Sequence, residues 1–426
     1  MWARKRIDIG TLNLTIALWH CVCPPSKKAS ETLIGRHFAS DDLLVCLSVR
    51  SGFDLFLSEQ DWPENSEIIF TGLTIPDMPR IAREHQLRPI GVDLDHAKLE
   101  PSIAEIRRLV TPQTKAIVVA HLLGGRLPTN EISLIAKEHG LLMIEDFAQS
   151  YRGQLIPSSN VAMFSFGTIK TNTALGGAIM VIQDPNLREK MADRQNKWPP
   201  QARFQYAKRI LKYSFVKFIS TRPVAGTIRR TCQFLPGQHD TFASGMAKSF
   251  SGVNFFKQIR HRPSDSLCST LARRISNFQP ESIDCRIRRG KLLAKTIKNG
   301  NPQIKILGDE IEYATYWIFG ILVKNPGKLT KILWTHGFDA TTQSSLRGIP
   351  FFPNDNPRLS NDQTDVIPIG GKQEKLPNID FMLSHLVFLP VDLPMPESEI
   401  TRMGDLVTHY AIPTTVTDER FPILQN

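Results

Sequence analysis

Two short apolar segments, each followed by polar side chains, constrain the fold of this chain more than any other feature. Residues 141–144 form an apolar run that predicts a buried strand, and Glu145 and Asp146 follow it directly. Residues 161–166 form a second such run, with Ser165 near its end. Strands of an open α/β sheet deliver the residues at their carboxyl ends into a ligand crevice. The acid and a lysine that follows the second run, Lys170, are therefore expected to face one crevice.

A lysine, Lys170, follows the second run in a turn that Gly176 and Gly177 close. Pyridoxal phosphate chemistry needs a lysine for the internal Schiff base and a carboxylate that keeps the pyridine nitrogen protonated. Asp146 and Lys170 could supply both groups. Another interpretation stays open for each residue alone, with Asp146 as the cap of a helix beginning near Phe147 and Lys170 as a solvated loop residue.

The sequence around these residues resembles the DegT/DnrJ/EryC1/StrS family of sugar aminotransferases. The family pattern is roughly EDxAQ, then SFxxxK, then a glycine pair, and this chain reads EDFAQSYRG and then FSFGTIKTNTALGG. The resemblance implies a fold-type I pyridoxal phosphate-dependent transferase of the α/β class, with a mainly parallel central sheet covered by helices and a smaller α+β C-terminal domain. It implies that Asp146 pairs with the pyridine nitrogen and that Gln149 lies near the phenolic oxygen of the cofactor. It further implies that Ser165 binds the cofactor phosphate and that Lys170 forms the Schiff base.

Two further cofactor-binding positions of the family carry unusual residues here. A predicted strand leads through Ser51 and Gly52 into a predicted helix over residues 53–59, whose first N–H groups would bind the cofactor phosphate. The family places a threonine where this chain has Phe53, so the backbone contribution remains and one hydroxyl is lost. The family also places a flat side chain over the pyridine ring near Ile75, so apolar contact is expected to replace stacking there.

The leading interpretation is a homodimeric aminotransferase in which Lys170 is also the general acid/base. The resemblance implies a nucleotide-linked keto sugar as the amine acceptor and an amino acid, glutamate, as the donor. The lysine argues against the dehydratase branch of the family, in which a histidine replaces it.

Departures from the family pattern keep a second interpretation open. Gly167 stands where a histidine is frequent, and Ala174 and Leu175 stand where the family commonly has a Gly-Glu pair. Together with Phe53 and Ile75, these departures would suit a degenerate relative that keeps the fold and has a binding or regulatory role.

Apolar runs alternate with helical segments around the central stretch, which predicts a parallel sheet covered on both faces. His121 ends one of these strands, and it either lines the site or is a structural histidine. The chain is expected to comprise an N-terminal helical segment (1–40), a large cofactor-binding α/β domain (41–260) and a small α+β domain (261–426). Predicted strands cover residues 43–49, 67–70, 88–93, 115–120, 141–144, 161–166 and 178–182, and predicted helices cover residues 53–59, 75–86, 102–110, 131–139 and 186–195.

The formal net charge of +11 indicates affinity for an anionic partner, such as a phosphorylated substrate or an acidic lipid surface. No nucleic-acid motif is present, so no nucleic-acid partner is expected. A basic amphipathic helix is predicted within an insertion at about residues 200–232, and it would either lie on an anionic membrane or pack on its own domain or a dimer partner. Its basic residues are Arg203, Lys208, Arg209, Lys212, Lys217, Arg222, Arg229 and Arg230, and its apolar face is formed by Phe204, Ala207, Leu211, Phe215 and Phe218.

The N-terminus is basic and then apolar, as a signal peptide would be, but Asp8 and Asn13 interrupt the apolar part. We therefore expect an amphipathic helix docked on the body of the protein. No run approaches the roughly 18 apolar residues of a membrane span. The six cysteines lack zinc-ligand spacing, so neither a metal site nor a disulfide framework is expected. A cytoplasmic protein, peripheral to the membrane if its basic helix binds lipid, fits best.

Overall fold

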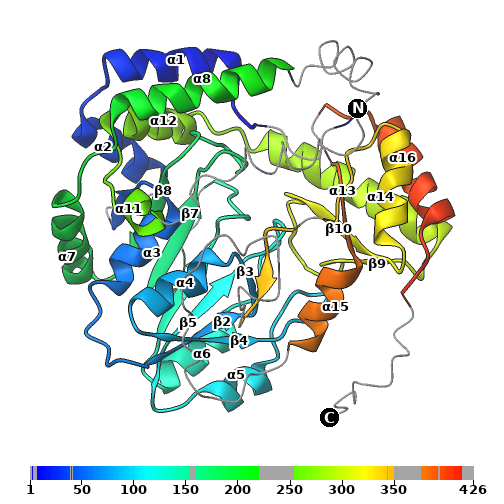
Figure 1. Ribbon diagram of the computed structural model, residues 1–426, viewed down its shortest axis with the longest axis horizontal. Coiled ribbons are helices and arrows are strands. Elements are labelled where there is room, and N and C mark those ends of the chain that lie inside the picture. Colours follow the sequence, from blue (N-terminus) through cyan, green and yellow to red (C-terminus); the bar gives the residue numbers. More distant parts are fainter. Residues whose placement is uncertain are drawn as a thin grey trace.

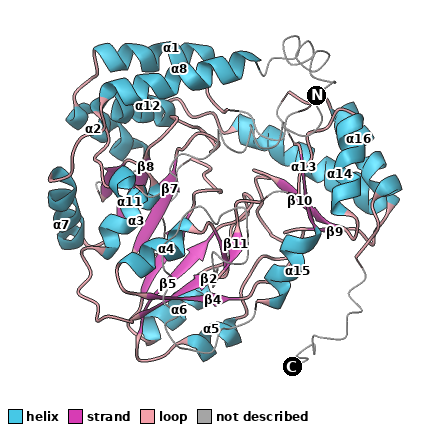
Figure 2. Cartoon of the chain, in the orientation of Figure 1, coloured by secondary structure: helices cyan, strands magenta, loops and turns pink. Residues whose placement is uncertain are grey.

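The computed structural model of the chain is built around one large sheet enclosed by helices (Figure 1 and Figure 2). The structure describes residues 2, 7–38, 40, 42–153, 157, 159–219, 254–342, 344–349, 376–391 and 394–414. The predicted basic residues Arg222, Arg229 and Arg230 lie outside the described residues.

The large sheet has seven strands in the order β1-β8-β7-β6-β5-β2-β4. The ladders from β4 through β2, β5 and β6 to β7 are all parallel, whereas β8 is antiparallel to both of its neighbours. The predicted mainly parallel sheet is therefore confirmed. The strands are β1 (Leu43–Cys46), β2 (Glu67–Thr71), β4 (Arg88–Val92), β5 (Thr114–Ala120), β6 (Leu142–Asp146), β7 (Val161–Ser165) and β8 (Ala178–Ile182).

Helices cover both faces of this sheet because its strands are apolar on both sides. In β8, Ala178 and Met180 belong to one core cluster, while Ile179 and Val181 belong to another on the opposite face. The first face packs against α3 (Val49–Leu57), α4 (Asp77–Glu84), α7 (Pro185–Asn196) and α11 (Phe255–Ile259). The second face packs against α1 (Thr11–Val22), α2 (Lys27–Phe38), α8 (Arg203–Ile219) and α12 (Asp265–Ser276) at one end, and against α5 (Ile103–Leu109) and α6 (Asn130–Glu138) at the other.

A smaller antiparallel sheet of order β12-β10-β9 lies in the C-terminal part of the chain. Its strands are β9 (Lys305–Ile306), β10 (Phe319–Leu322) and β12 (Leu386–Leu389), and its helices are α13 (Glu281–Gly300), α14 (Pro326–Thr335), α15 (Pro377–His385) and α16 (Glu397–Tyr410). A short ribbon of β3 (Leu73–Thr74) and β11 (Arg347–Gly348) joins the C-terminal part to the large sheet. The domain boundary expected at residues 260 and 261 stays a prediction.

The helix after β1 begins earlier than the sequence predicts. The expected start was Phe53, whereas α3 begins at Val49 because the hydroxyl of Ser48 accepts the Ser51 N–H at 3.1 Å. Phe53 consequently lies inside the helix with no exposed side-chain surface, and its ring packs edge-on against Phe70 at 6.2 Å between centroids.

The N-terminal helix docks on the body of the protein as predicted, because α1 packs against α12 and α8. The apolar stripe predicted for the basic helix α8 does not pack on the protein's own domain, which was one of the alternatives left open by the sequence. The buried residues of α8 are Tyr206, Ile210 and Tyr213, whereas the predicted apolar stripe, of which Phe204 and Phe215 are members, is exposed to solvent. Over the described part of the chain, no helix has both the length and the apolar character needed to cross a membrane.

Candidate active site

The carboxyl ends of β5, β6 and β7 meet at one edge of the large sheet. Asp146 is the last residue of β6 and pairs in register with Ala120 of β5 and Met163 of β7. Ser165 is the last residue of β7. Because β1 runs in the same direction as β7, the N-terminus of α3 lies at this edge as well. The strand ends that carry Asp146 and Ser165 therefore lie at the same edge of the sheet.

The loop after β7 holds Lys170 in a fixed turn. The Lys170 N–H donates to the Gly167 carbonyl at 3.0 Å, and the Gly176 N–H donates to the Phe166 carbonyl at 3.1 Å. Gly177 has a φ of +85°, a conformation that favours glycine, and its N–H donates to the Leu47 carbonyl at 3.0 Å. These bonds fold the loop back onto the strand ends, so the backbone of Lys170 is positioned before any ligand binds.

The side chain of Lys170 lies against Trp317, a residue that the sequence analysis did not single out. Its Nζ lies 4.6 Å from the centroid of a Trp317 ring, within the range of a cation–π interaction. The Trp317 indole N–H donates to the Ile169 carbonyl at 3.2 Å, which fixes the ring beside the lysine. Nothing in the sequence marks this tryptophan, because only the fold of the C-terminal part brings it to the loop.

Asp146 accepts a hydrogen bond from the backbone and lies near Lys170, Arg50 and the imidazole of His121. Its Oδ1 accepts the Ala148 N–H at 2.8 Å. Burial raises the pKa of Asp146, although this hydrogen bond and the nearby Lys170, His121 and Arg50 act in the opposite direction. The residues that follow Asp146 form a turn, so the alternative in which Asp146 caps a helix is not what the structure shows.

His121 is a structural residue. Its side chain is almost completely buried, its Nδ1 accepts the Leu127 N–H at 3.1 Å, and its Nε2 lies 3.1 Å from Oε1 of Glu145. Because Nδ1 is an acceptor, the ring proton is on Nε2, and this N–H donates a hydrogen bond to the Glu145 carboxylate. The ring also stacks on Phe147 at 4.2 Å, which supports the backbone next to Asp146.

Three polar side chains near Lys170 and Asp146 could bind the remaining groups of a cofactor. Gln149 uses its Oε1 to accept the Leu123 N–H at 2.9 Å, which leaves its NH₂ group as a donor. The Ser165 hydroxyl is half-buried and lies 3.5 Å from the Gly167 nitrogen. The Thr168 hydroxyl is buried and has no hydrogen-bond partner, which calls for a ligand or a water molecule. Thr168 was not predicted, although it lies between the predicted serine and lysine.

At the start of α3, Ser51 and Phe53 were predicted to contact the cofactor, but their side chains are buried within the protein. The backbone N–H and the hydroxyl of Ser51 both bond to Ser48, and a Cβ added to Gly52 would meet the sulfur of Met180 at 2.5 Å. The side chains of Ser51 and Phe53 therefore face the protein interior, and Gly52 serves close packing of the helix on β8.

Ile75 is half-buried between β3 and α4 and packs against the core clusters on both faces of the sheet. Its contact with a cofactor stays a prediction, as do the individual roles of Asp146, Gln149, Ser165 and Lys170.

The residues at this edge fit pyridoxal phosphate. The half-buried Asp146 carboxylate, whose pKa is raised, suits a protonated ring nitrogen, because that cation would favour the ionised form of the acid. The unpartnered Thr168 hydroxyl and the Ser165 hydroxyl suit a phosphate, and Lys170 supplies the amine. The backbone at the start of α3 adds the positive end of a helix dipole at the same edge.

An arginine pair lies near Phe147, the residue that follows Asp146. The guanidinium carbon of Arg126 is 5.8 Å from the centroids of both the Phe147 and the Tyr313 rings, and that of Arg152 is 3.8 Å from the Tyr313 centroid. The Nε and Nη2 atoms of Arg126 and the hydroxyl of Tyr313 are buried without hydrogen-bond partners. Burial and the charge of Arg152 lower the pKa of Arg126. Two adjacent cations with unused donors are the chemistry of an anion site.

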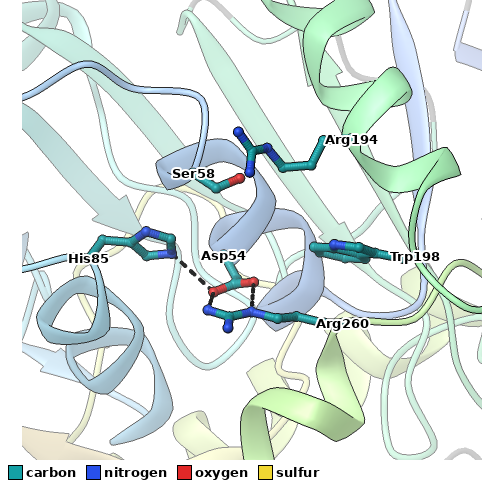
Figure 3. Close-up of a pocket in the computed structure, with 6 residues that line it drawn as sticks. All are labelled: Asp54, Ser58, His85, Arg194, Trp198 and Arg260. Atoms are coloured by element: carbon teal, nitrogen blue, oxygen red, sulfur yellow. Dashed lines mark hydrogen bonds and ion pairs between the residues drawn. The ribbon is translucent and has the colours of Figure 1, made fainter.

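A separate cavity of about 450 Å³ lies between α3 and α7, away from these residues (Figure 3). Its buried Asp54 accepts two hydrogen bonds of 2.9 Å from Arg260 and lies 3.0 Å from Nε2 of His85. Burial would raise the pKa of Asp54, but the His85 and Arg260 hydrogen bonds lower it. The remaining lining cation, Arg194, is paired with Glu59. Because the charged groups lining this cavity are already paired, we assign it a structural role. The described residues also contain no group of three acidic, histidine or cysteine side chains that could hold a metal.

The sequence of residues 28–210 matches the model of the DegT/DnrJ/EryC1/StrS aminotransferase family. Aminotransferases of this family depend on pyridoxal phosphate. This match agrees with the predicted family over residues 28–210.

Solved structures that resemble this one share its fold over nearly the whole chain. The sugar aminotransferase CalS13 from Micromonospora echinospora has a TM-score of 0.66 and 16% identity, with 96% of this chain and 100% of that chain covered. DesI, solved in the presence of its TDP-sugar product, has a TM-score of 0.64 and 16% identity, with 95% and 91% covered. The E. coli GDP-4-keto-6-deoxy-D-mannose-3-dehydratase, solved with hydrated pyridoxal phosphate bound, has a TM-score of 0.66 and 15% identity, with 95% and 99% covered. The fold-type I prediction is confirmed, and both aminotransferases and a dehydratase have this fold.

Proposed function

We propose that this chain is a pyridoxal phosphate-dependent sugar aminotransferase. The premise is that residues 28–210 match the sequence model of the DegT/DnrJ/EryC1/StrS family. The amine acceptor of this chain is a nucleotide-linked keto sugar, and its donor is an amino acid, with glutamate as our choice from the family resemblance. We further propose a cytoplasmic homodimer, which the same resemblance implies.

The observation that supports this proposal best is that Asp146 and the loop carrying Lys170 lie at the same edge of the sheet. The charge of Lys170 acts on the Asp146 carboxyl although the two residues lie on different segments of the chain. A degenerate binding protein has no chemical need for a positioned lysine near a half-buried acid, since desolvating a carboxylate without a partner is unfavourable. The lysine also separates this chain from a dehydratase of the same fold, in which the resemblance places a histidine.

Each residue of the site would have its own role in binding the cofactor or in moving a proton. Pyridoxal phosphate, when bound, supplies a ring that accepts electrons from a carbon that loses a proton. The Asp146 carboxylate would hold the proton on the ring nitrogen, and the Ser165 and Thr168 hydroxyls would bind the phosphate. The Nζ of Lys170 would anchor the cofactor at rest and move the proton at the substrate carbon. Trp317 keeps this amine beside the loop that carries it.

The purified protein is expected to be yellow, and borohydride should bleach it because reduction fixes the cofactor to Lys170. Absorption spectra before and after borohydride, followed by mass mapping of the labelled peptide, measure both points. A protein that remains colourless after incubation with added cofactor would support the degenerate interpretation instead.

The arginine pair supports the nucleotide-linked substrate. The diphosphate of such a substrate is a dianion, and Arg126, Arg152 and Tyr313 offer it unused or exposed donors. The backbone connects this cluster to the lysine, because Tyr313 is four residues before Trp317, a distance of at most about 14 Å along an extended chain. The Tyr313 carbonyl also accepts the Arg126 N–H at 3.1 Å, so the cluster is fixed to the loop that follows β5.

Replacing both arginines by glutamine is expected to raise the KM for a nucleotide-linked keto sugar by roughly tenfold or more, because each charge-assisted hydrogen bond contributes about 1.5–3 kcal/mol. The half-reaction with the amino-acid donor should stay within about twofold of the unaltered protein. Steady-state kinetics with a TDP- or GDP-linked keto sugar and single-turnover kinetics with glutamate separate the two effects. An unchanged KM for the sugar would remove the arginine pair from the substrate site.

A further inference from the structure

Helices α1 and α8 present a second apolar face that no described part of the protein covers. The two helices run side by side along one edge of the molecule, with α12 beneath them (Figure 1). Their outward side chains include Trp19, which is 62% exposed, and Phe204 and Phe215, which are 71% and 64% exposed. The outer face of α1 and α8 is formed by Leu12, Trp19 and Val22 of α1 and by Phe204, Leu211, Phe215 and Phe218 of α8.

This outer face is not needed to hold α8 on the protein. The inward side of α8 is already packed through Tyr206, Ile210 and Tyr213, and the Tyr206 hydroxyl donates to the Ala174 carbonyl at 2.7 Å. An amphipathic helix of a globular protein buries one apolar stripe and exposes polar residues on the other side. Here the opposite side also exposes large apolar side chains at helical spacing, and apolar side chains gathered on one exposed face mark an interaction surface.

The charges around the outer face favour an anionic partner over a second copy of the chain. Lys208 and Lys212 lie beside the stripe on α8, both exposed, and neither has an acidic partner among the described residues. The sequences of α1 and α8 contain no acidic residue at all. In a two-fold contact between copies, these lysines would approach one another without compensation. At an anionic lipid surface the same lysines would meet headgroup phosphates while the aromatic and aliphatic side chains enter the interface.

We propose that the outer face of α1 and α8 binds the surface of an anionic lipid membrane. The protein then lies on the membrane with its two helices parallel to the surface. Tryptophan and phenylalanine are side chains that insert at this depth, and lysine stems reach from there to the headgroups. This surface contains no residue of the candidate active site, so the proposal can be tested independently of the aminotransferase activity.

Flotation of the full-length protein with liposomes tests the proposal, using phosphatidylcholine alone and phosphatidylcholine with about 30% phosphatidylserine. Binding is expected only to the anionic vesicles and should weaken at high salt, because the lysine contribution is screened. Lys208→Glu with Lys212→Glu should lower the partition coefficient by at least about 25-fold, given roughly fivefold for each cationic charge near the surface. Leu211→Ser with Phe215→Ser should lower it by more than about tenfold, because the buried apolar area is lost.

Leu134→Ser is the matched control, since Leu134 is 55% exposed on α6 and lies outside the outer face. This variant should bind anionic vesicles as the unaltered protein does. Circular dichroism and the visible cofactor band should be unchanged in all variants, which shows that they fold. Binding that survives both pairs of substitutions would overturn the proposal. A change from dimer to monomer in the Leu211→Ser and Phe215→Ser variant, without any lipid binding by the unaltered protein, would assign the face to a second copy.

Discussion

Replacing Lys170 by alanine is expected to abolish transamination and to leave a protein that binds pyridoxal phosphate only reversibly. The amine of Lys170 is the group that would anchor the cofactor and also move the proton at the substrate carbon. Loss of a general acid/base typically slows a reaction by about two to four powers of ten, and loss of the covalent anchor adds to this. Turnover with a keto sugar and glutamate, together with the absorption spectrum after dialysis, measures both losses.

Lys137→Ala is the control for this experiment, because Lys137 is an exposed lysine at the end of α6. It should keep full activity and full colour. The backbone of the loop that carries Lys170 is fixed by hydrogen bonds of Gly167, Phe166 and Gly177, none of which involves the lysine side chain. The alanine variant should therefore fold normally by circular dichroism. If it retained a borohydride-stable cofactor, another lysine would have to be the anchor.

The sheet, and the edge of it at which Asp146 and the loop of Lys170 lie, could be predicted from the sequence because both depend on local patterns. Apolar runs of four to seven residues define the strands, and parallel strands bring their carboxyl ends to one edge whatever the details of packing. The predicted start of α3 was wrong because the sequence was compared with a family motif centred on Ser51 and Gly52. The capping hydroxyl belongs to Ser48, three residues earlier.

Other parts of the site could not be predicted because they depend on contacts between distant segments. Trp317 and Tyr313 reach the large sheet through the C-terminal part, and no periodicity in the sequence points to them. The sequence could not show which face of α8 is buried, for a related reason. Helical periodicity shows which residues share a face, but α8 carries two apolar faces, and only packing against α1 and α12 decides which one is buried.

Replacing Asp146 by asparagine is expected to separate cofactor binding from catalysis. Lys170 is untouched, so the variant should still be yellow and should still be bleached by borohydride. The asparagine side chain keeps the oxygen that accepts the Ala148 N–H but loses the charge that holds the ring nitrogen protonated. The half-reaction with excess glutamate, followed as loss of the visible band, should slow by about two to four powers of ten, comparable with loss of a general acid.

The same variant can also be measured without the cofactor, and there the substitution is expected to stabilise the protein, whereas it slows the reaction of the protein with cofactor bound. Burial raises the pKa of Asp146 above its value in the unfolded chain, so the folded state binds a proton at this carboxyl more tightly than the unfolded state does. The contribution of the group to the free energy of unfolding therefore falls as the pH rises through these two pKa values. At neutral pH the Asp146→Asn apoprotein should melt at a higher temperature than the unaltered apoprotein, and the difference should vanish at pH values below both.

The partner of a cationic ring nitrogen should have two properties. Its ionised form should be destabilised when the cofactor is absent, and turnover should require it when the cofactor is bound. If the variant reacts with glutamate as fast as the unaltered protein, Asp146 is not that partner. If in addition its melting temperature does not change with pH relative to the unaltered protein, the carboxyl is not desolvated, and the assignment of this edge of the sheet to the cofactor fails.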